Sequence, residues 1–241
     1  MPEGYRKAVL PNGIRLVTEA MPHVRSVAVG VWVDTGSRVE PEERGGISHL
    51  IEHLVFKGTA TRSAEAIARA IDSVGGHMDA FTAKEHTCFY VGVLDEHLPL
   101  AVDLLSDILM RPLFSPDDIE KEKAVVLQEI KMVEDTPDDL IHDLFAEQVW
   151  AGHPLGRPIL GQWERVKTFD RATILRHFEE EYAPGRITVA VDPMKTTGVN
   201  GEKTTVSVTV TQAGPLKVEL MTLVSTLGGV AHYMPVLIGS N

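Results

Sequence analysis

The sequence contains a single cysteine, Cys88, among its 241 residues. One thiol cannot build an internal disulfide framework, and sparse cysteine is typical of proteins from reducing compartments. The first residues, MPEGYRKAVLPNG, also lack the apolar core of a signal peptide and the Arg- and Ser-rich pattern of a transit peptide. We therefore expect a cytoplasmic protein.

Basic side chains are also scarce: 23 Lys and Arg stand against 34 Asp and Glu, which gives a formal net charge of −11. Such a surface repels phosphate backbones, so no nucleic-acid partner is expected, and it favours peptides or partners that carry Lys and Arg. The one long uncharged run, residues 220–241, contains Gly228, Gly229 and Pro235 and makes a poor membrane helix. We expect no membrane partner.

Strand and helix patterns occur in blocks without regular alternation. The strand SVAVGVWVD carries Val27, Val29, Val31 and Val33 on one face, and we expect it to be buried on both sides. A Ser-Pro-Asp-Asp sequence at 115–118 and a Thr-Pro-Asp-Asp sequence at 136–139 each predict a helix start. The predicted helices are 46–57, 63–74, 95–110, 116–134, 137–150 and 170–182; the predicted strands are 26–34, 77–83, 86–94 and 186–191, with a hairpin over 5–19.

This order predicts an α+β fold, a two-layer sandwich of helices on a mixed, mainly antiparallel sheet. The composition changes after Val191, where the chain becomes rich in Thr and Val. We therefore predict one domain over residues 1–191 and an atypical C-terminal tail, unassigned, over residues 192–241.

The run SHLIEH places His49, Glu52 and His53, together with Phe56, on one face of a predicted helix. Two imidazoles at i and i+4 can reach one metal ion, with a carboxylate beside them, which is the inverted order H-x-x-E-H of certain zinc peptidases. A chance pair of histidines on a solvated face is the alternative, since the chain has 10 histidines.

A catalytic zinc ion usually takes three protein ligands, and the helix from Pro116 can supply the third. Its residues Glu122, Val126, Glu129 and Val133 share one face. Carboxylates are rarely buried beside valines unless they are paired or bound to metal. An ordinary solvated glutamate on a mixed helix is the alternative here.

Five segments together resemble the N-terminal half of the pitrilysin/insulinase family of inverzincins, in particular bacterial proteins similar to the mitochondrial processing peptidase beta subunit. They are DTGSRVE, GGISHLIEHLVFKGT, GGHMDAFTAKEHTCFY, VVLQEIKMVEDTPDDLIHDLF and HPLGRPILG, within residues 5–191. The resemblance implies that His49, His53 and Glu129 bind Zn, that Glu52 is the general base, and that Glu122 supports catalysis by orienting a ligand histidine.

The resemblance also implies that the strand around 77–83 pairs with an extended substrate backbone, which makes Asp79, Ala80, Phe81 and Thr82 candidate substrate-binding residues. Phe81 is expected to line a side-chain pocket. Many relatives have Asn where this chain has Asp79, so the backbone contact expected at that position departs from the family's pattern.

Members of this family normally contain two related halves that close over a peptide, and this chain has the length of one half. The sequence therefore predicts half of a zinc-dependent endopeptidase for short or unfolded peptides, working with a second homologous half or subunit. Two alternatives stay open. One is a catalytically silent, partner-binding subunit, and the other is a zinc enzyme acting on a small ligand.

Overall fold

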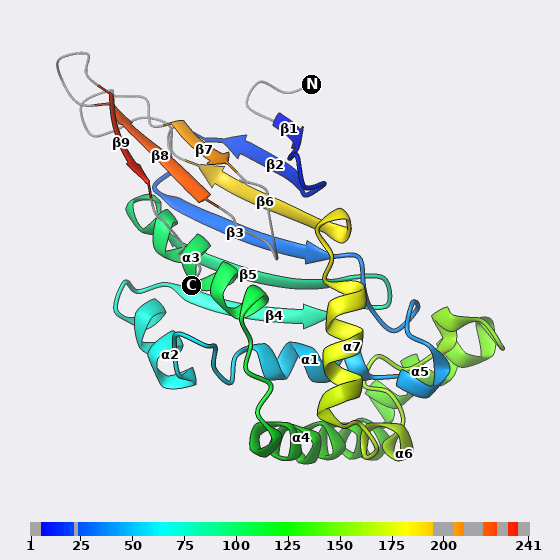
Figure 1. Cartoon of the computed structure of the whole chain (residues 1–241). Helices are drawn as coiled ribbons and strands as arrows, with labels where there is room; N and C mark the ends of the chain where they lie inside the picture. Colours follow the sequence, from blue (N-terminus) through cyan, green and yellow to red (C-terminus); the bar gives the residue numbers. More distant parts are fainter. Residues whose placement is uncertain (1–5, 22–23, 195–204, 210–218, 226–230, 236–241) are drawn as a thin grey trace.

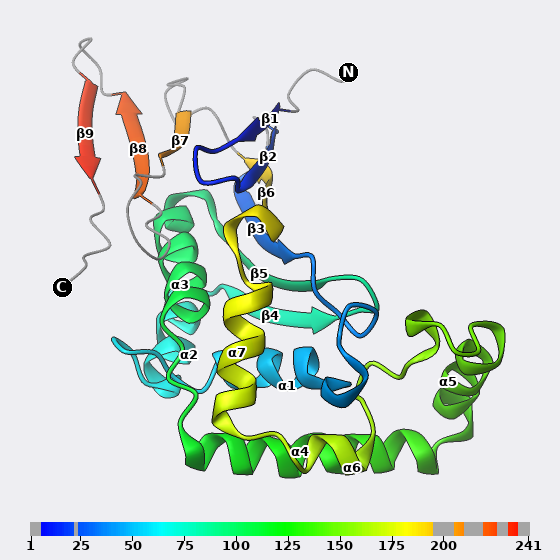
Figure 2. The same ribbon diagram turned by 45° about the vertical axis from the view of Figure 1, so that its right-hand side comes forward.

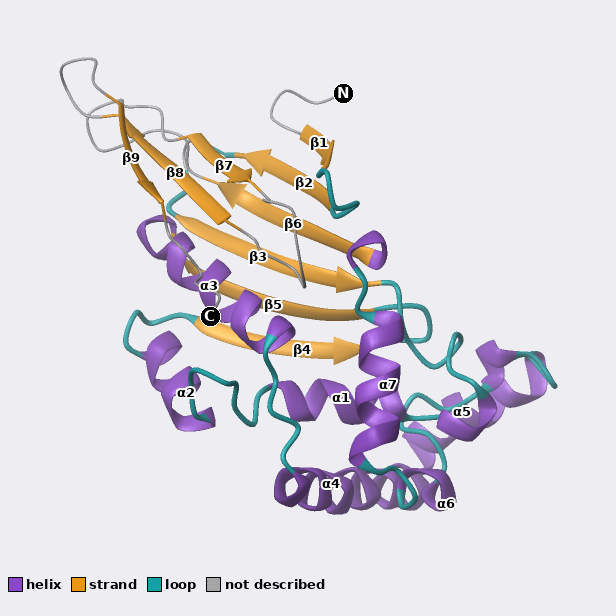
Figure 3. Cartoon of the chain, viewed as in Figure 1, coloured by secondary structure: helices purple, strands orange, loops and turns teal. Residues whose placement is uncertain are grey.

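The computed structural model describes residues 6–21, 24–194, 205–209, 219–225 and 231–235 (Figure 1). Helices lie on one side of a six-stranded sheet, as the helix and strand colours in Figure 3 show. The predicted α+β fold of two layers is confirmed. Within the described part of the chain, no helix is both long and apolar enough to cross a membrane.

The sheet is mixed and mainly antiparallel, as predicted. Its strand order is β1-β2-β6-β3-β5-β4, and every neighbouring pair is antiparallel except β2 with β6. The strands are β1 (Arg6–Val9), β2 (Arg15–Ala20), β3 (Ser26–Val33), β4 (His77–Thr82), β5 (Thr87–Leu94) and β6 (Ile187–Met194). This order leaves β4 at one edge of the sheet, next to the helix that carries the H-x-x-E-H residues.

The predicted hairpin at Asn12-Gly13 joins β1 to β2. Gly13 has a φ of 93°, a left-handed conformation that glycine adopts without steric cost. The Asn12 side chain accepts a hydrogen bond from the Ile14 amide at 3.1 Å, which closes the turn.

The prediction that the valine-rich strand β3 is buried on both sides is wrong. Val27, Val29 and Val33 are at most 1% exposed, whereas Ser26 and Ala28 on the other face are exposed. The described helices cover only one face of the sheet, and the other face of β3 carries Ser26, Ala28, Gly30 and Trp32, which are exposed or partly exposed. Alternation of period two, which the valines show, is the pattern of a strand buried on one face.

Apart from the short α6, which was not predicted, the α-helices of the described part follow the predicted blocks closely. They are α1 (Ile47–Val55), α2 (Ala64–Asp72), α3 (Leu98–Met110), α4 (Pro116–Asp135), α5 (Pro137–Val149), α6 (Trp163–Val166) and α7 (Arg171–Glu181). Ser115 caps α4 as predicted, since its hydroxyl accepts the Asp118 amide at 3.2 Å. Thr136 precedes α5 but makes no such cap, because its hydroxyl donates instead to the Met132 carbonyl at 2.7 Å.

Helix α1 lies against β4, and α4 runs beneath α1, as Figure 2 shows. Buried apolar side chains hold α1 between α4 and the sheet: Ile47, Leu50, Ile51, Leu54 and Val55 are each at most 1% exposed. Because these apolar side chains face the core, the polar side chains of α1 lie on its remaining, less buried face.

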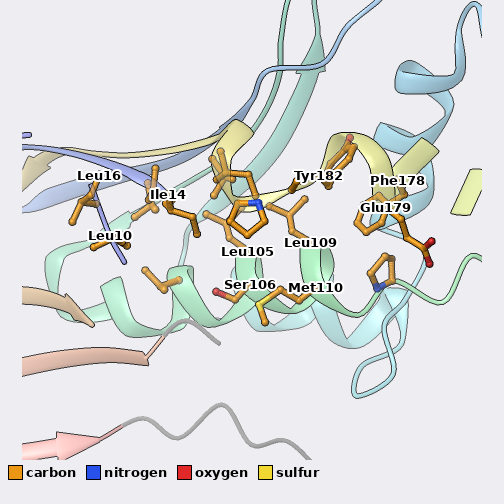
Figure 4. A pocket seen from close by; sticks show the side chains of 18 of the residues that line it. Leu10, Ile14, Leu16, Leu105, Ser106, Leu109, Met110, Phe178, Glu179 and Tyr182 are labelled. Atoms are coloured by element: carbon orange, nitrogen blue, oxygen red, sulfur yellow. The ribbon is translucent and has the colours of Figure 1, made fainter. Parts of the chain in front are cut away.

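An apolar groove of about 590 Å³ lies between the sheet and helices α3 and α7 (Figure 4). Its walls include Leu10, Ile14, Leu16, Leu105, Leu109, Met110 and Phe178. Glu179 and Tyr182 are the only ionisable residues among its described lining. The groove is lined mainly by apolar side chains, and it contains none of the predicted site residues.

Beyond β6, three strands form a separate antiparallel sheet in the order β7-β8-β9. They are β7 (Thr205–Thr209), β8 (Glu219–Ser225) and β9 (Ala231–Pro235). The remaining residues of the predicted tail, 195–204, 210–218, 226–230 and 236–241, lie outside the described residues. The division at residue 191 stays a prediction.

Candidate metal centre

The H-x-x-E-H residues lie on the half-buried face of α1. The helix begins at Ile47, directly after Gly46, whose φ of 92° turns the chain into the helix. His49, Glu52 and His53 are partly buried, while the apolar residues between them are in the core. Glu122 and Glu129 on the facing helix α4 meet this face of α1, as the sequence predicted.

His49, His53 and Glu129 form a group whose ligand atoms all lie within 4.8 Å of one another. The two histidine Nε2 atoms are 3.3 Å apart, and Oε2 of Glu129 is 3.7 Å from each of them. Donors at the usual Zn–N distance from a tetrahedral ion are about 3.3 Å apart. The group therefore has the donor chemistry and nearly the spacing that zinc requires.

Glu122 holds the second histidine in the orientation that metal binding needs. Its Oε2 lies 3.2 Å from Nδ1 of His53, and its Oε1 lies 2.9 Å from Nζ of Lys57. A carboxylate at Nδ1 accepts that proton and leaves the Nε2 lone pair directed at the metal group. Lys57, near the end of α1, compensates the charge of the buried Glu122.

His49 is in the neutral form that can bind a metal. Burial, together with the smaller effect of the nearby His53, lowers its pKa to about 4. Its Nδ1 atom is buried and has no hydrogen-bond partner among the described residues. No side chain therefore orients His49 in the way that Glu122 orients His53.

Glu52 lies between the metal group and strand β4. The Thr82 hydroxyl donates a hydrogen bond of 2.5 Å to its Oε2 atom. Burial raises the pKa of Glu52; the charges of Asp79 and Glu129 add to this rise, while the Thr82 bond and His53 oppose it. The Glu52 carboxylate is thus a better proton acceptor than an exposed glutamate. Thr82 bonds only its Oε2 atom, so Oε1 can accept a proton.

Strand β4 brings only some of the predicted substrate-binding residues to the face of the sheet that packs against α1. Ala80 and Thr82 alternate with Asp79 and Phe81, which lie on the opposite face of the sheet. There Phe81 is 40% exposed and packs edge-on against Trp32, and Asp79 accepts a 3.3 Å hydrogen bond from the Tyr90 hydroxyl. A substrate pocket lined by Phe81 stays a prediction, and its side chain does not face the metal group.

Sequence reasoning missed Glu40, which is buried at 2% exposure. It ends the DTGSRVE segment and lies six residues before the glycine that opens α1. The signal available was one of three loop carboxylates, Glu40, Glu42 and Glu43, between two structured blocks, and such residues are too common in loops to single out.

Comparison with known proteins gives the family of the chain. Residues 15–162 match the profile of Insulinase (Peptidase family M16). The "uncharacterized zinc protease YmxG" of Bacillus subtilis is 48% identical over 180 residues, which are 75% of this chain and 44% of that protein. The chain thus spans about half the length of the curated relatives it matches.

Solved structures share the fold. A protease from Helicobacter pylori superposes with a TM-score of 0.76 at 22% identity, over 79% of this chain and 46% of that one. A structure titled an inactive domain of peptidase M16, from Pseudomonas fluorescens, gives a TM-score of 0.72 at 16% identity, over 78% of this chain and 46% of the other. Because the family profile covers more than half of the sequence and its H-x-x-E-H helix, the chain belongs to the insulinase family of peptidases.

Proposed function

We propose that the chain is the metal-binding half of a zinc-dependent endopeptidase that hydrolyses short or unfolded peptides. The observation that carries this proposal is the convergence of His49, His53 and Glu129 beside an oriented carboxylate, Glu52. Relatives at 48% identity carry the name zinc protease, which supports zinc as the metal.

A zinc ion held by His49, His53 and Glu129 would supply Lewis-acid activation of a water molecule and of the peptide carbonyl. Glu52 is placed to accept the proton of that water, because its pKa is raised and the Thr82 hydroxyl fixes one of its oxygens. After the carbonyl is attacked, the same carboxylic acid can return the proton to the leaving amine. Glu122 keeps His53 in the tautomer that binds metal throughout.

The peptide would bind along β4. In the described part of the sheet β4 pairs only with β5, so its outer edge offers free backbone N–H and C=O groups. An extended peptide can add to such an edge as a further strand, which places its backbone beside Thr82 and Glu52. The net charge of −11 favours substrates or partners with Lys and Arg.

We further propose that the working enzyme needs a second homologous half. The curated relatives are about twice as long as the region this chain covers. An open sheet edge leaves a bound peptide in contact with water, which weakens positioning and electrostatic stabilisation of the reaction.

The single cysteine supports the cytoplasmic location expected from the sequence.

The experiment is turnover of an unstructured Arg-containing peptide by the zinc-loaded chain, alone and with the second half of a family member added. We expect slow cleavage alone and faster cleavage with the second half. The Glu52→Gln variant should retain zinc and lose hydrolysis in both conditions, because an amide cannot accept the water's proton.

A second candidate is a catalytically silent partner subunit, because one matching fold is titled an inactive domain. Zinc binding without any cleavage, even with the second half present, would establish that candidate. Robust turnover by a demonstrated monomer would show that the second half is not needed.

A further inference from the structure

The N-terminus of helix α1 is capped by a side chain from outside the helix. Its N-cap residue, Gly46, has no side chain to satisfy the first amides of the helix. The buried carboxylate of Glu40 does so instead: Oε2 accepts the Gly46 amide and Oε1 accepts the Ser48 amide, each at 2.8 Å. These are amides that a helix cannot satisfy internally.

Burying this carboxylate is unfavourable by itself. Burial raises the pKa of Glu40, and the two backbone amides and the charge of Arg157 oppose that rise. Arg157 also donates a 2.5 Å hydrogen bond to the Glu40 backbone carbonyl. A buried carboxylate persists where such donors compensate its lost hydration, so Glu40 is anchored on both its side chain and its backbone.

A second segment, the loop around Gly161, packs closely against the N-terminus of α1. A Cβ atom on Gly161 would lie 2.3 Å from the Gly45 carbonyl oxygen and 2.7 Å from Cα of Gly46. No side chain fits at that distance, so the backbone of the loop that carries Arg157 sits directly on the start of α1. The first turn of α1 is thus held between the Glu40 carboxylate and Gly161.

This first turn contains His49, which directly follows Ser48. His53, one turn later, has Glu122 to orient it, whereas His49 has no hydrogen-bond partner at Nδ1 in the described structure. The distance of 3.7 Å between His49 Nε2 and Glu129 Oε2 therefore depends on where the first turn of α1 lies relative to α4.

We propose that Glu40 is a positioning residue of the metal centre: it holds the first turn of α1 so that His49 reaches the same ion as His53 and Glu129. This inference rests on the proposed zinc function. It assigns to Glu40 a role toward one ligand, His49, and not toward His53.

The test is metal affinity, measured by chelator competition with Zn²⁺ on the folded chain. The Glu40→Gln variant keeps the size of the side chain but replaces one acceptor oxygen with a donor. We expect zinc affinity to fall about 10–100-fold, the range found when groups behind metal ligands are changed. The visible spectrum of the Co²⁺-loaded variant should also change, because the His49 ligand is displaced.

Ser63→Ala is the matched control. The Ser63 hydroxyl caps α2 by accepting the Ala66 amide at 3.2 Å, and α2 carries none of the metal group. Like Glu40→Gln, this variant loses a helix cap and some stability. Its zinc affinity should nevertheless equal that of the parent chain.

A double-mutant cycle separates positioning of His49 from a general loosening of the site. In a His49→Ala background, Glu40→Gln should cause no further loss of affinity, whereas in a Glu122→Gln background its full loss should persist. A folded Glu40→Gln chain with parental affinity would overturn the inference, as would an equal loss in the His49→Ala background.

If Glu40→Gln does not fold, Glu40→Asp replaces it. The shorter carboxylate keeps its charge but cannot reach both amides, so a smaller loss of the same kind is expected, and parental affinity would again refute the role. A parent chain that binds no zinc would refute the proposed function together with this inference. Zinc binding by the parent with unchanged affinity in both Glu40 variants refutes the inference alone.

Discussion

Asp107 on α3 holds the loop that follows helix α1, and its removal should destabilise the chain strongly. The side chain is fully buried. It accepts hydrogen bonds from the hydroxyls of Thr59 at 2.7 Å and Thr61 at 2.8 Å. It also pairs with Arg62 and Arg111, each at 2.9 Å.

Asp107→Ala leaves these donors without their acceptor. Removing one partner of a buried ion pair costs about 3–5 kcal/mol. Arg62 retains its pair with Asp103 at 2.5 Å, and the two arginine side chains are 28% and 26% exposed, so water can reach them. These facts favour the lower end of that range, about 3 kcal/mol of unfolding free energy.

The effect should depend on pH. Burial alone would raise the pKa of Asp107, but the bonds from Thr59, Thr61 and Arg62 and the charge of Arg111 outweigh it, so the folded-state pKa lies below 3.8. A depressed pKa stabilises the fold above the unfolded-state value and loses this contribution as the pH falls through the folded-state value. The difference between parent and variant should therefore be full at pH 7 and shrink below about pH 4.

Urea unfolding followed by circular dichroism, from pH 7 to pH 3, measures both effects. Glu65→Gln is the control, because Glu65 and Arg69 form an exposed ion pair on α2, with side chains 71% and 77% exposed, and such pairs contribute little. An Asp107→Ala chain as stable as the parent at pH 7 would refute the network's role. A stability difference that stays constant down to pH 3 would refute the pKa argument.

Three further predictions concern the metal group and its surroundings. His49→Ala or Glu129→Ala should sharply lower zinc content in metal analysis, and full occupancy in both would contradict the ligand set. Glu122→Gln should lower zinc affinity by about 10–100-fold without abolishing it; complete loss would make Glu122 a ligand. Burial lowers the pKa of His177 to about 4, so between pH 6.5 and 4 only the unfolded chain binds a proton at this residue. His177→Gln should therefore make the free energy of unfolding depend less on pH in that interval. An unchanged pH dependence in urea titrations would contradict this.

The metal group itself could be predicted from sequence because its signals are local. The spacing of His49 and His53 places both on one face of any helix, and Glu122 and Glu129 share a face in the same way. The structure then brings those two faces together. Periodicity gives the side of an element on which a residue lies, and this was sufficient to predict which side chains share a face; their roles at a metal stay predictions.

What covers each face could not be predicted, because it depends on segments distant in sequence. Strand β3 shows the limit: its valines are buried, but the described helices leave its other face exposed. Phe81 shows it as well, since its place on the outer face follows from which side of β4 the helix α1 packs against. Thr136 failed as a cap although Ser115 succeeded, because its hydroxyl was taken by the end of the preceding helix.

The polar face of α1 shows why local spacing specifies this site only in part. On a helix, His49, Glu52 and His53 lie within about 100° of one another, so their order alone directs them to one region. Yet the final position of each depends on a different element: His53 on Glu122 of α4, Glu52 on Thr82 of β4, and the His49 turn on the loop containing Glu40. A change at Thr82 should therefore lower hydrolysis and spare zinc affinity, whereas a change at Glu122 or Glu40 should lower zinc affinity first. Separate readouts of zinc affinity and of hydrolysis by the zinc-loaded chain can detect that division.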